Sequence, residues 1–173
     1  MQSDHDQAQR KLGKGFWIGA WICVLILLVM FFDDKLQQQY NPNQNVDYQN
    51  EGGVATVVLK RNRAGHYLTG GFINGQPVTF LLDTGATHVA IPQQVADKIG
   101  LERGSRHDVN TANGLSFGYR TQIDSLEIGA INLTQVSASI VPNFSGEEIL
   151  LGMSALKQVE FTQRGSTLTI KYY

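Results

Sequence analysis

The stretch Phe80-Leu-Leu-Asp83-Thr-Gly-Ala-Thr87 decides the fold of this 173-residue chain. Three apolar residues lead directly into one acid, Asp83, and a carboxylate at the end of an apolar strand is costly unless something compensates it. The glycine that follows allows a sharp turn, and the Thr84 hydroxyl can hydrogen-bond across that turn. The sequence therefore predicts a carboxylate presented at the floor of a cleft. A purely structural role is the alternative, in which the aspartate only accepts hydrogen bonds from the next backbone amides.

The longer segment Gln76–Ile91 resembles the active-site segment of retropepsin-like aspartic proteases, and in particular their small bacterial membrane-anchored branch. Thr111-Ala-Asn-Gly114 is similar to the flap-region signature of that branch. Ile149-Leu-Leu-Gly-Met-Ser-Ala-Leu156 is similar to the apolar strand, glycine and short helix that close the retropepsin lobe. The resemblance covers about residues 65–173, and three motifs in the same order are more specific than any one of them.

The resemblance assigns roles to particular residues. Asp83 is expected to be the catalytic general acid/base, Thr84 to hydrogen-bond the facing backbone, and Gly85 to make the turn with its amide towards the carboxylate. Gly152 is expected to pack behind this turn. Substrate contacts are expected from Ala86 and from a flap hairpin that contains Thr111, Ala112, Asn113 and Gly114. An ordinary surface hairpin is the alternative for that last segment.

Hydrolysis by this route needs two carboxylates around one water molecule, with one of the pair protonated. Asp-Thr-Gly occurs once in the sequence and Asp-Ser-Gly does not occur. Asp97, Asp108 and Asp124 lack such a turn and are expected at the solvated surface or as caps of strand ends. We therefore expect a homodimer in which each copy contributes Asp83 across a twofold axis. The function predicted is endopeptidase activity on a protein or peptide substrate, and a non-catalytic peptide-binding or envelope interaction module is the alternative.

Turn signals at short intervals predict an all-β fold. Asn74-Gly75 and Asn113-Gly114 are each flanked by strand-like runs, which is typical of hairpins. A short helix is expected from Pro92 to a Gly100 cap. Other strands are expected at 54–60, 67–73, 76–82, 108–111, 115–119, 122–128, 131–141, 159–162 and 167–172. The predicted fold is a retropepsin-like closed β-barrel or sandwich with one or two short helices.

The N-terminal third predicts a membrane anchor. Residues 1–14 are polar and include three basic residues, and 15–32 are uncharged and apolar, at the short end of what spans a bilayer. Basic residues before the run and Asp33 and Asp34 after it place the N-terminus in the cytoplasm. A cleaved signal peptide is the alternative, although no small-x-small site follows the run. The amide-rich segment 33–50 is expected to be a flexible linker to a protease domain at 51–173. By the family resemblance, this domain lies on the periplasmic side of a bacterial inner membrane.

Composition argues against several other classes of protein. The formal net charge is −1 without a basic stripe, so nucleic acid is not an expected partner. Cys23 is the sole cysteine and lies in the apolar run, and no histidine pair has metal-ligand spacing, so neither a metal nor a cofactor is expected. His66, His88 and His107 are expected in polar surface positions, the first and last of them in turns. Serine or cysteine catalysis has no supporting motif.

Overall fold

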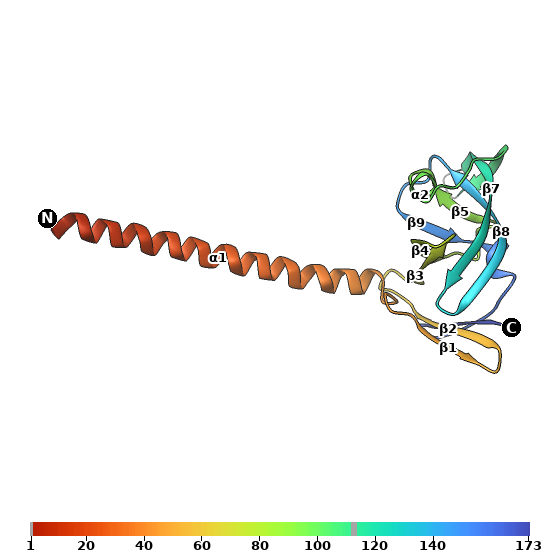
Figure 1. Cartoon of the computed structure of the whole chain (residues 1–173), viewed down its shortest axis with the longest axis horizontal. Coiled ribbons are helices and arrows are strands. Elements are labelled where there is room, and N and C mark those ends of the chain that lie inside the picture. Colours follow the sequence, from red (N-terminus) through yellow and green to blue (C-terminus); the bar gives the residue numbers. More distant parts are fainter. Residues whose placement is uncertain (1, 112–113) are drawn as a thin grey trace. The chain divides into compact units, whose positions relative to one another are not determined.

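The computed structural model describes residues 2–111 and 114–173 and divides the chain into two compact units, Met1–Gln39 and Tyr40–Tyr173 (Figure 1). The first unit consists of helix α1, which runs Gln2–Tyr40 and ends at the first residue of the second unit. In this helix, the segment Phe16–Tyr40 contains an 18-residue stretch with a mean hydropathy of 2.3 and is long and apolar enough to cross a membrane. A signal sequence near the N-terminus can also meet these criteria of length and composition.

Residues 33–50 differ from the flexible linker expected from their composition. Helix α1 continues to Tyr40, and strand β1 (Asp47–Glu51) pairs antiparallel with β2 (Val54–Lys60). Between them Asn43 is only 3 % exposed. Its Nδ2 donates to the carbonyls of Lys60 and Leu68 at 2.9 and 2.7 Å, and its Oδ1 accepts from the Lys60 amide at 2.7 Å. The linker expectation was wrong for this part of the segment, because a side-chain amide here pairs backbone groups that would otherwise be unpaired.

The second unit is all-β with two short helices, as the sequence predicts. After β1 and β2 its elements are β3 (Leu68–Ile73), β4 (Gln76–Leu82), β5 (Val89–Pro92), α2 (Gln93–Lys98), β6 (Arg106–Thr111), β7 (Gly114–Ile128), β8 (Ile131–Val141), β9 (Glu148–Leu151), α3 (Met153–Leu156), β10 (Glu160–Arg164) and β11 (Thr167–Tyr172).

Two sheets organise these strands. The larger has the order β3-β4-β9-β5-β8-β7-β6, and a further β3–β7 pairing at Phe72↔Glu127 and Ile73↔Leu126 closes it into a barrel. Strand β6 lies outside that closure as the partner of the first part of β7. The smaller sheet has the order β1-β2-β11-β10, so both ends of this unit meet in it. The β1 and β2 strands are seen at the bottom of Figure 1, near the C-terminus. The expected closed β-barrel is confirmed.

The core is built from strand alternation inside the barrel. Phe80, Ile91, Ile123, Ile140 and Ile149 are all fully buried, and they come from five different strands. Phe80 lies three residues before Asp83, so the core fixes the strand that carries the acid. Burying a side chain of this size stabilises the fold by about 1.5–3 kcal/mol.

Two turns have the backbone conformation that the sequence predicts, and one strand is longer than expected. Asn74 and Gly75 both have positive φ, +49° and +77°, as a type I′ hairpin requires, and Gly100 after α2 has a φ of +72°. Strand β7 is a single strand of 15 residues where two shorter ones were expected. It is continuous because its first part pairs with β6 while the rest pairs with β8.

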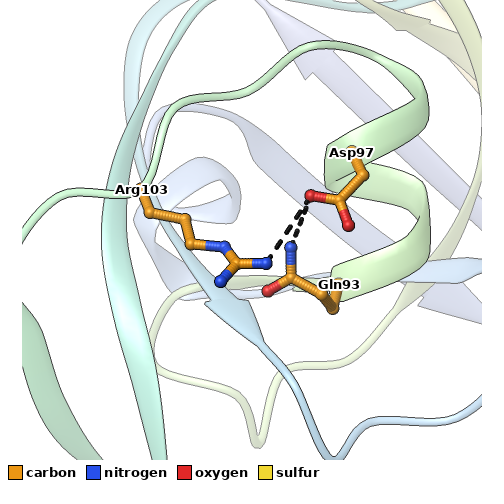
Figure 2. A network of polar contacts seen from close by, with 3 residues as sticks. All are labelled: Gln93, Asp97 and Arg103. Carbon is orange, nitrogen blue, oxygen red and sulfur yellow. Dashed lines mark hydrogen bonds and ion pairs between the residues drawn. The ribbon is translucent and has the colours of Figure 1, made fainter.

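Helix α2 is joined to the following loop by a small polar network (Figure 2). Gln93 Nε2 donates to Asp97 Oδ1 at 2.7 Å, and Arg103 Nη2 lies 3.7 Å from the same oxygen. The Arg103 guanidinium also lies over the Tyr119 ring of β7, at 5.4 Å from its centroid. The Asp97 side chain is 62 % exposed, so its ion pair is worth about 0–1 kcal/mol. The expectation that Asp97 is a surface residue is confirmed.

The role of Asn43 leads to a prediction about stability. In the unit Tyr40–Tyr173, Asn43→Ala leaves the Lys60 amide and the Leu68 carbonyl without their partner. We expect the free energy of unfolding, measured by urea titration, to fall by about 2–3 kcal/mol, the cost of buried groups left unpaired. Asn45 is exposed, and Asn45→Ala is the matched control, with an expected change within about 0.5 kcal/mol. An Asn43→Ala protein as stable as this control would contradict a structural role for the segment.

Candidate active site

Asp83 follows the last residue of β4 and begins a tight turn. Gly85 N donates to Asp83 Oδ1 at 2.9 Å, and Ala86 N donates to the Asp83 carbonyl at 3.2 Å. The Asp83 side chain is half-buried, whereas Thr84 and Gly85 are exposed. A Cβ at position 85 would lie 3.2 Å from Asp83 Oδ1, so the glycine keeps the space beside the carboxylate open. The turn therefore holds one carboxylate oxygen by a backbone amide and leaves the group accessible.

The turn rests on the connection between β9 and α3. Asp83 N donates to the Leu151 carbonyl at 3.2 Å, and Met153 N donates to the Ala86 carbonyl at 2.8 Å. Between these two bonds lies Gly152, at which a Cβ would stand 2.3 Å from the His88 carbonyl oxygen. Any side chain at 152 would therefore push the turn away. The expected packing of Gly152 behind Asp83-Thr-Gly is what this geometry describes.

A buried serine fixes the far end of the same turn. Ser154 Oγ accepts from Val89 N at 3.0 Å and donates to the Ser137 carbonyl at 2.7 Å. Ser154 N also donates to the Thr87 carbonyl at 3.0 Å. Ser154 of helix α3 thus links the residues after the turn to strand β8 by hydrogen bonds. Both ends of the segment that contains Asp83 are therefore hydrogen-bonded to the barrel.

A groove of about 1030 Å³ opens in front of Asp83. Its polar lining comes from the turn, from β6, β7 and β8 and from the loop after β8, and its apolar lining also includes residues of β5 and β9. The residues that line it are Asp83, Gly85, Ala86, Thr87, His88, Ala90, His107, Asp108, Val109, Leu115, Ser116, Arg120, Ser139, Val141, Asn143, Phe144 and Leu150. In residues 2–111 and 114–173 no group of three or more His, Cys, Asp or Glu side chains is placed to hold a metal ion. An extended chain with mixed apolar and polar side chains fits such a groove.

The structure brings only part of the predicted site together. Asp83, Gly85 and Ala86 line the groove, while Thr84 is exposed on the turn. The β6–β7 pairing extends to Thr111 opposite Gly114, and their neighbour Leu115, 87 % exposed, is at the groove. Ala112 and Asn113 lie outside the described residues. Substrate contacts by Thr111, Ala112, Asn113 and Gly114 therefore stay predictions, as does the role of their hairpin as a flap.

Sequence reasoning missed several groove residues. His107 was expected in a polar turn, but it lies in strand β6 with its Nε2 3.0 Å from Ser139 Oγ, so that expectation was wrong. Asp108 was expected at the surface and does line the groove, although its side chain is exposed. Strand alternation through 107 and 109 was the signal that could have placed His107 beside Val109. The contact with Ser139 had no sequence signal, because the two residues are 32 positions apart.

Comparison with known proteins agrees with this geometry. Residues 69–158 match the family described as gag-polyprotein putative aspartyl protease. A retropepsin-like aspartic protease from Rickettsia conorii superposes with a TM-score of 0.59 at 25 % identity, over 74 % of this chain and 96 % of that one.

Two sequence relatives are also similar. An uncharacterized protein from the region 5′ of cobV in a Sinorhizobium species is 28 % identical over 170 residues, covering 91 % of this chain and 73 % of the relative. An uncharacterized Rickettsia prowazekii protein is 20 % identical over 122 residues, which cover 66 % of this chain and 53 % of that relative.

The family match includes β4, the Asp83-Thr-Gly turn, the β6–β7 hairpin and the β9–α3 connection that supports the turn. These are the elements that form the groove and hold the carboxylate in it. The chain belongs to the retropepsin-like aspartic protease family.

Proposed function

We propose that the chain is a membrane-anchored aspartic endopeptidase that activates water between the Asp83 carboxylates of two copies. The observation that carries this proposal is the half-buried, backbone-held Asp83 carboxylate in the lining of a groove large enough for a peptide. A general acid and a general base on opposite sides of one water are what peptide hydrolysis needs. One Asp-Thr-Gly turn provides half of that pair.

The proposed chemistry uses the pair as a unit. Two carboxylates that face each other across a twofold axis cannot both be ionised, so the pair holds one proton. The ionised group takes a proton from water as the water oxygen bonds to the peptide carbonyl carbon. The protonated group gives its proton to the carbonyl oxygen, and collapse of the adduct breaks the C–N bond with a proton passed to the leaving amine. The Gly85 amide holds one Asp83 oxygen in place during these steps.

Asp108 is the other aspartate at the groove and must be considered as an alternative partner. On strand β6 it pairs with Phe117, and alternation puts both of their side chains on the hairpin face opposite to His107, Val109 and Ser116. Its side chain is exposed, and it is not part of an Asp-Thr-Gly turn. These features favour a second copy of the chain as the source of the second carboxylate. They also make Asp108 a useful control.

The exposed Thr84 and Gly85 suit a twofold contact. In the resembled family the threonine of this turn hydrogen-bonds the facing turn, and here its side chain is free of the barrel core. Attachment of both copies to one membrane would raise their effective concentration and favour pairing. Retropepsin-like proteases typically act as dimers that bind peptides, which is the arrangement proposed for this chain.

The proposed location is a bacterial inner membrane, with α1 as a single span and residues 40–173 on the periplasmic side. Support comes from the length and hydropathy of Phe16–Tyr40 and from Arg10, Lys11 and Lys14 on its N-terminal side. The segment Met30-Phe-Phe-Asp-Asp-Lys, where the apolar run ends, has no small-residue cleavage site, which favours an uncleaved anchor over a signal peptide.

The first prediction from this function concerns Asp83. Asp83→Asn keeps the size of the side chain but cannot take a proton, so kcat on a peptide substrate should fall at least about 100-fold. The matched control is Asp108→Asn, which should retain activity within about threefold, since no proton transfer is assigned to Asp108. Rates are measured by release of a fluorogenic peptide. Equal losses in the two variants would overturn the assignment of Asp83.

The dimer leads to a second, quantitative prediction. When wild-type and Asp83→Asn chains are co-expressed in equal amounts, about one quarter of randomly assembled dimers carry two intact carboxylates. Activity per chain should then follow the square of the wild-type fraction. A monomeric enzyme would instead lose activity in direct proportion to that fraction. The two curves are separated by a titration of the expression ratio, with chain amounts measured by mass spectrometry.

A third prediction concerns the anchor. The mature protein should stay with membranes after alkaline carbonate extraction and should keep residues N-terminal to Phe16, because the span is not removed. N-terminal sequencing of the extracted protein and protease accessibility of the C-terminal unit in spheroplasts measure this. A mature N-terminus beyond residue 32 would show that the apolar helix is a cleaved signal peptide.

A further inference from the structure

The inner face of the β6–β7 hairpin carries polar side chains into the groove. His107 pairs with Gly118 and Val109 with Ser116, so strand alternation puts His107, Val109 and Ser116 on one face. All three line the groove that contains Asp83. The same alternation along β7 adds Arg120, which also lines the groove and pairs with Ser139 of β8.

The imidazole of His107 is held by the barrel rather than by the hairpin alone. Its Nε2 lies 3.0 Å from Ser139 Oγ, and Ser139 is only 3 % exposed. The facing residue, Gly118, has no side chain, and a Cβ there would lie 3.5 Å from His107 Cε1. The ring therefore packs against the backbone at 118 and is held at Nε2 by the bond to Ser139.

Two buried polar atoms on this face have no hydrogen-bond partner in the described part of the chain. They are His107 Nδ1 and Ser116 Oγ. A buried donor or acceptor left unpaired is costly, so a partner from outside the chain is favoured at this place. When Ser139 donates to Nε2, the neutral imidazole carries its hydrogen on Nδ1, and that hydrogen needs an acceptor. The Ser116 hydroxyl can donate to the same acceptor.

We propose that His107, Ser116 and Arg120 form a subsite for an acidic side chain of the peptide substrate, with Ser139 as the residue that positions the imidazole. A carboxylate has the oxygen acceptors that the imidazole and hydroxyl need, and the Arg120 guanidinium adds an opposite charge. This inference rests on the proposed function, since the occupant is a peptide in the proteolytic groove. The subsite specifies a class of substrate, namely peptides with Glu at one position near the cleaved bond.

Two carboxylates of the chain lie around the subsite and carry the same negative charge as the acidic side chain of the substrate. Asp83 lies in the lining of the groove, and Asp108 belongs to the outer face of the hairpin by alternation. The substrate carboxylate is therefore expected at the hairpin side of the groove, beside Arg120 and away from the Asp83 carboxylate. A carboxamide keeps the oxygen but loses the charge, so Gln should be accepted less well than Glu.

The test uses the full chain in detergent and one fluorogenic peptide that the wild-type protein cleaves. Glu, Gln and Leu are placed in turn at each position around the cleaved bond. At one position kcat/KM should be about 10- to 100-fold higher for Glu than for Leu, the worth of hydrogen bonds to a charged group. If Glu is preferred at none of the positions, the proposal is overturned. If Glu and Gln give equal rates, the proposed contribution of the carboxylate charge is overturned.

Substitutions in the chain test which residues cause the preference for Glu over Leu. His107→Leu should bring the Glu/Leu ratio close to one, and His107→Gln, which keeps a hydrogen-bonding group, should restore part of it. His66→Leu is the matched control because His66 is exposed in the turn after β2, and it should keep the wild-type ratio. A ratio unchanged in His107→Leu would overturn the proposal. If that variant does not fold, Ser116→Ala should lower the ratio, and an unchanged ratio there would have the same consequence.

A binding measurement separates this inference from the proposed function. Asp83→Asn protein is titrated with Glu and Leu peptides by fluorescence anisotropy, with and without His107→Leu. Preferential binding of the Glu peptide that His107→Leu removes would support the subsite even if the wild-type chain cleaves nothing. Cleavage without any such binding preference would support the protease and overturn the subsite. Absence of both cleavage and peptide binding would overturn both.

Discussion

Backbone hydrogen bonds between the Asp83 turn and the β9–α3 connection hold the functional part of this molecule in place. Leu151 accepts from the Asp83 amide at 3.2 Å, and Met153 donates to Ala86 at 2.8 Å. The contact is so close that only glycine fits at position 152. Because β9 is also a central strand of the barrel, between β4 and β5, the core and the turn cannot shift independently. A carboxylate used for proton transfer needs this kind of fixed support.

The same arrangement leaves the carboxylate side of the turn open. Thr84 and Gly85 are exposed, and Asp83 is half-buried in one chain. Full burial of an unpaired carboxylate would be expensive, so a single copy keeps this group in contact with solvent. Under the proposed function, the second copy would cover the turn and supply the other acid at the same moment. The energetic cost of burial would then be offset by the shared proton and the contacts between the two turns.

The groove has two chemically different sides. On the turn side, backbone amides and carbonyls fix one acid, and the small side chains of Ala86 and Ala90 leave room for a peptide. On the hairpin side, an imidazole and a hydroxyl have buried atoms without partners in the described residues. Under the two proposals made above, catalysis belongs to the turn side and recognition of a substrate side chain to the hairpin side.

The sequence by itself determined the all-β class, the position of the acid and the Asn74-Gly75 turn, because each depends on local spacing and backbone conformation. The expectation that Gly152 lies behind the turn came from the resemblance of Ile149–Leu156 to the family's strand, glycine and short helix. It also determined the apolar character of Phe16–Phe32. Only the tertiary structure decided that Asn43 is buried between Lys60 and Leu68, that β7 is one continuous strand, and that His107 meets Ser139. The hydrogen bonds of Asn43 and His107 join residues 17 to 32 positions apart, and the chain brings these residues together only in the folded tertiary structure. Local pattern cannot specify such pairs, since hydrogen-bonding partners in a closed sheet are set by strand order and register.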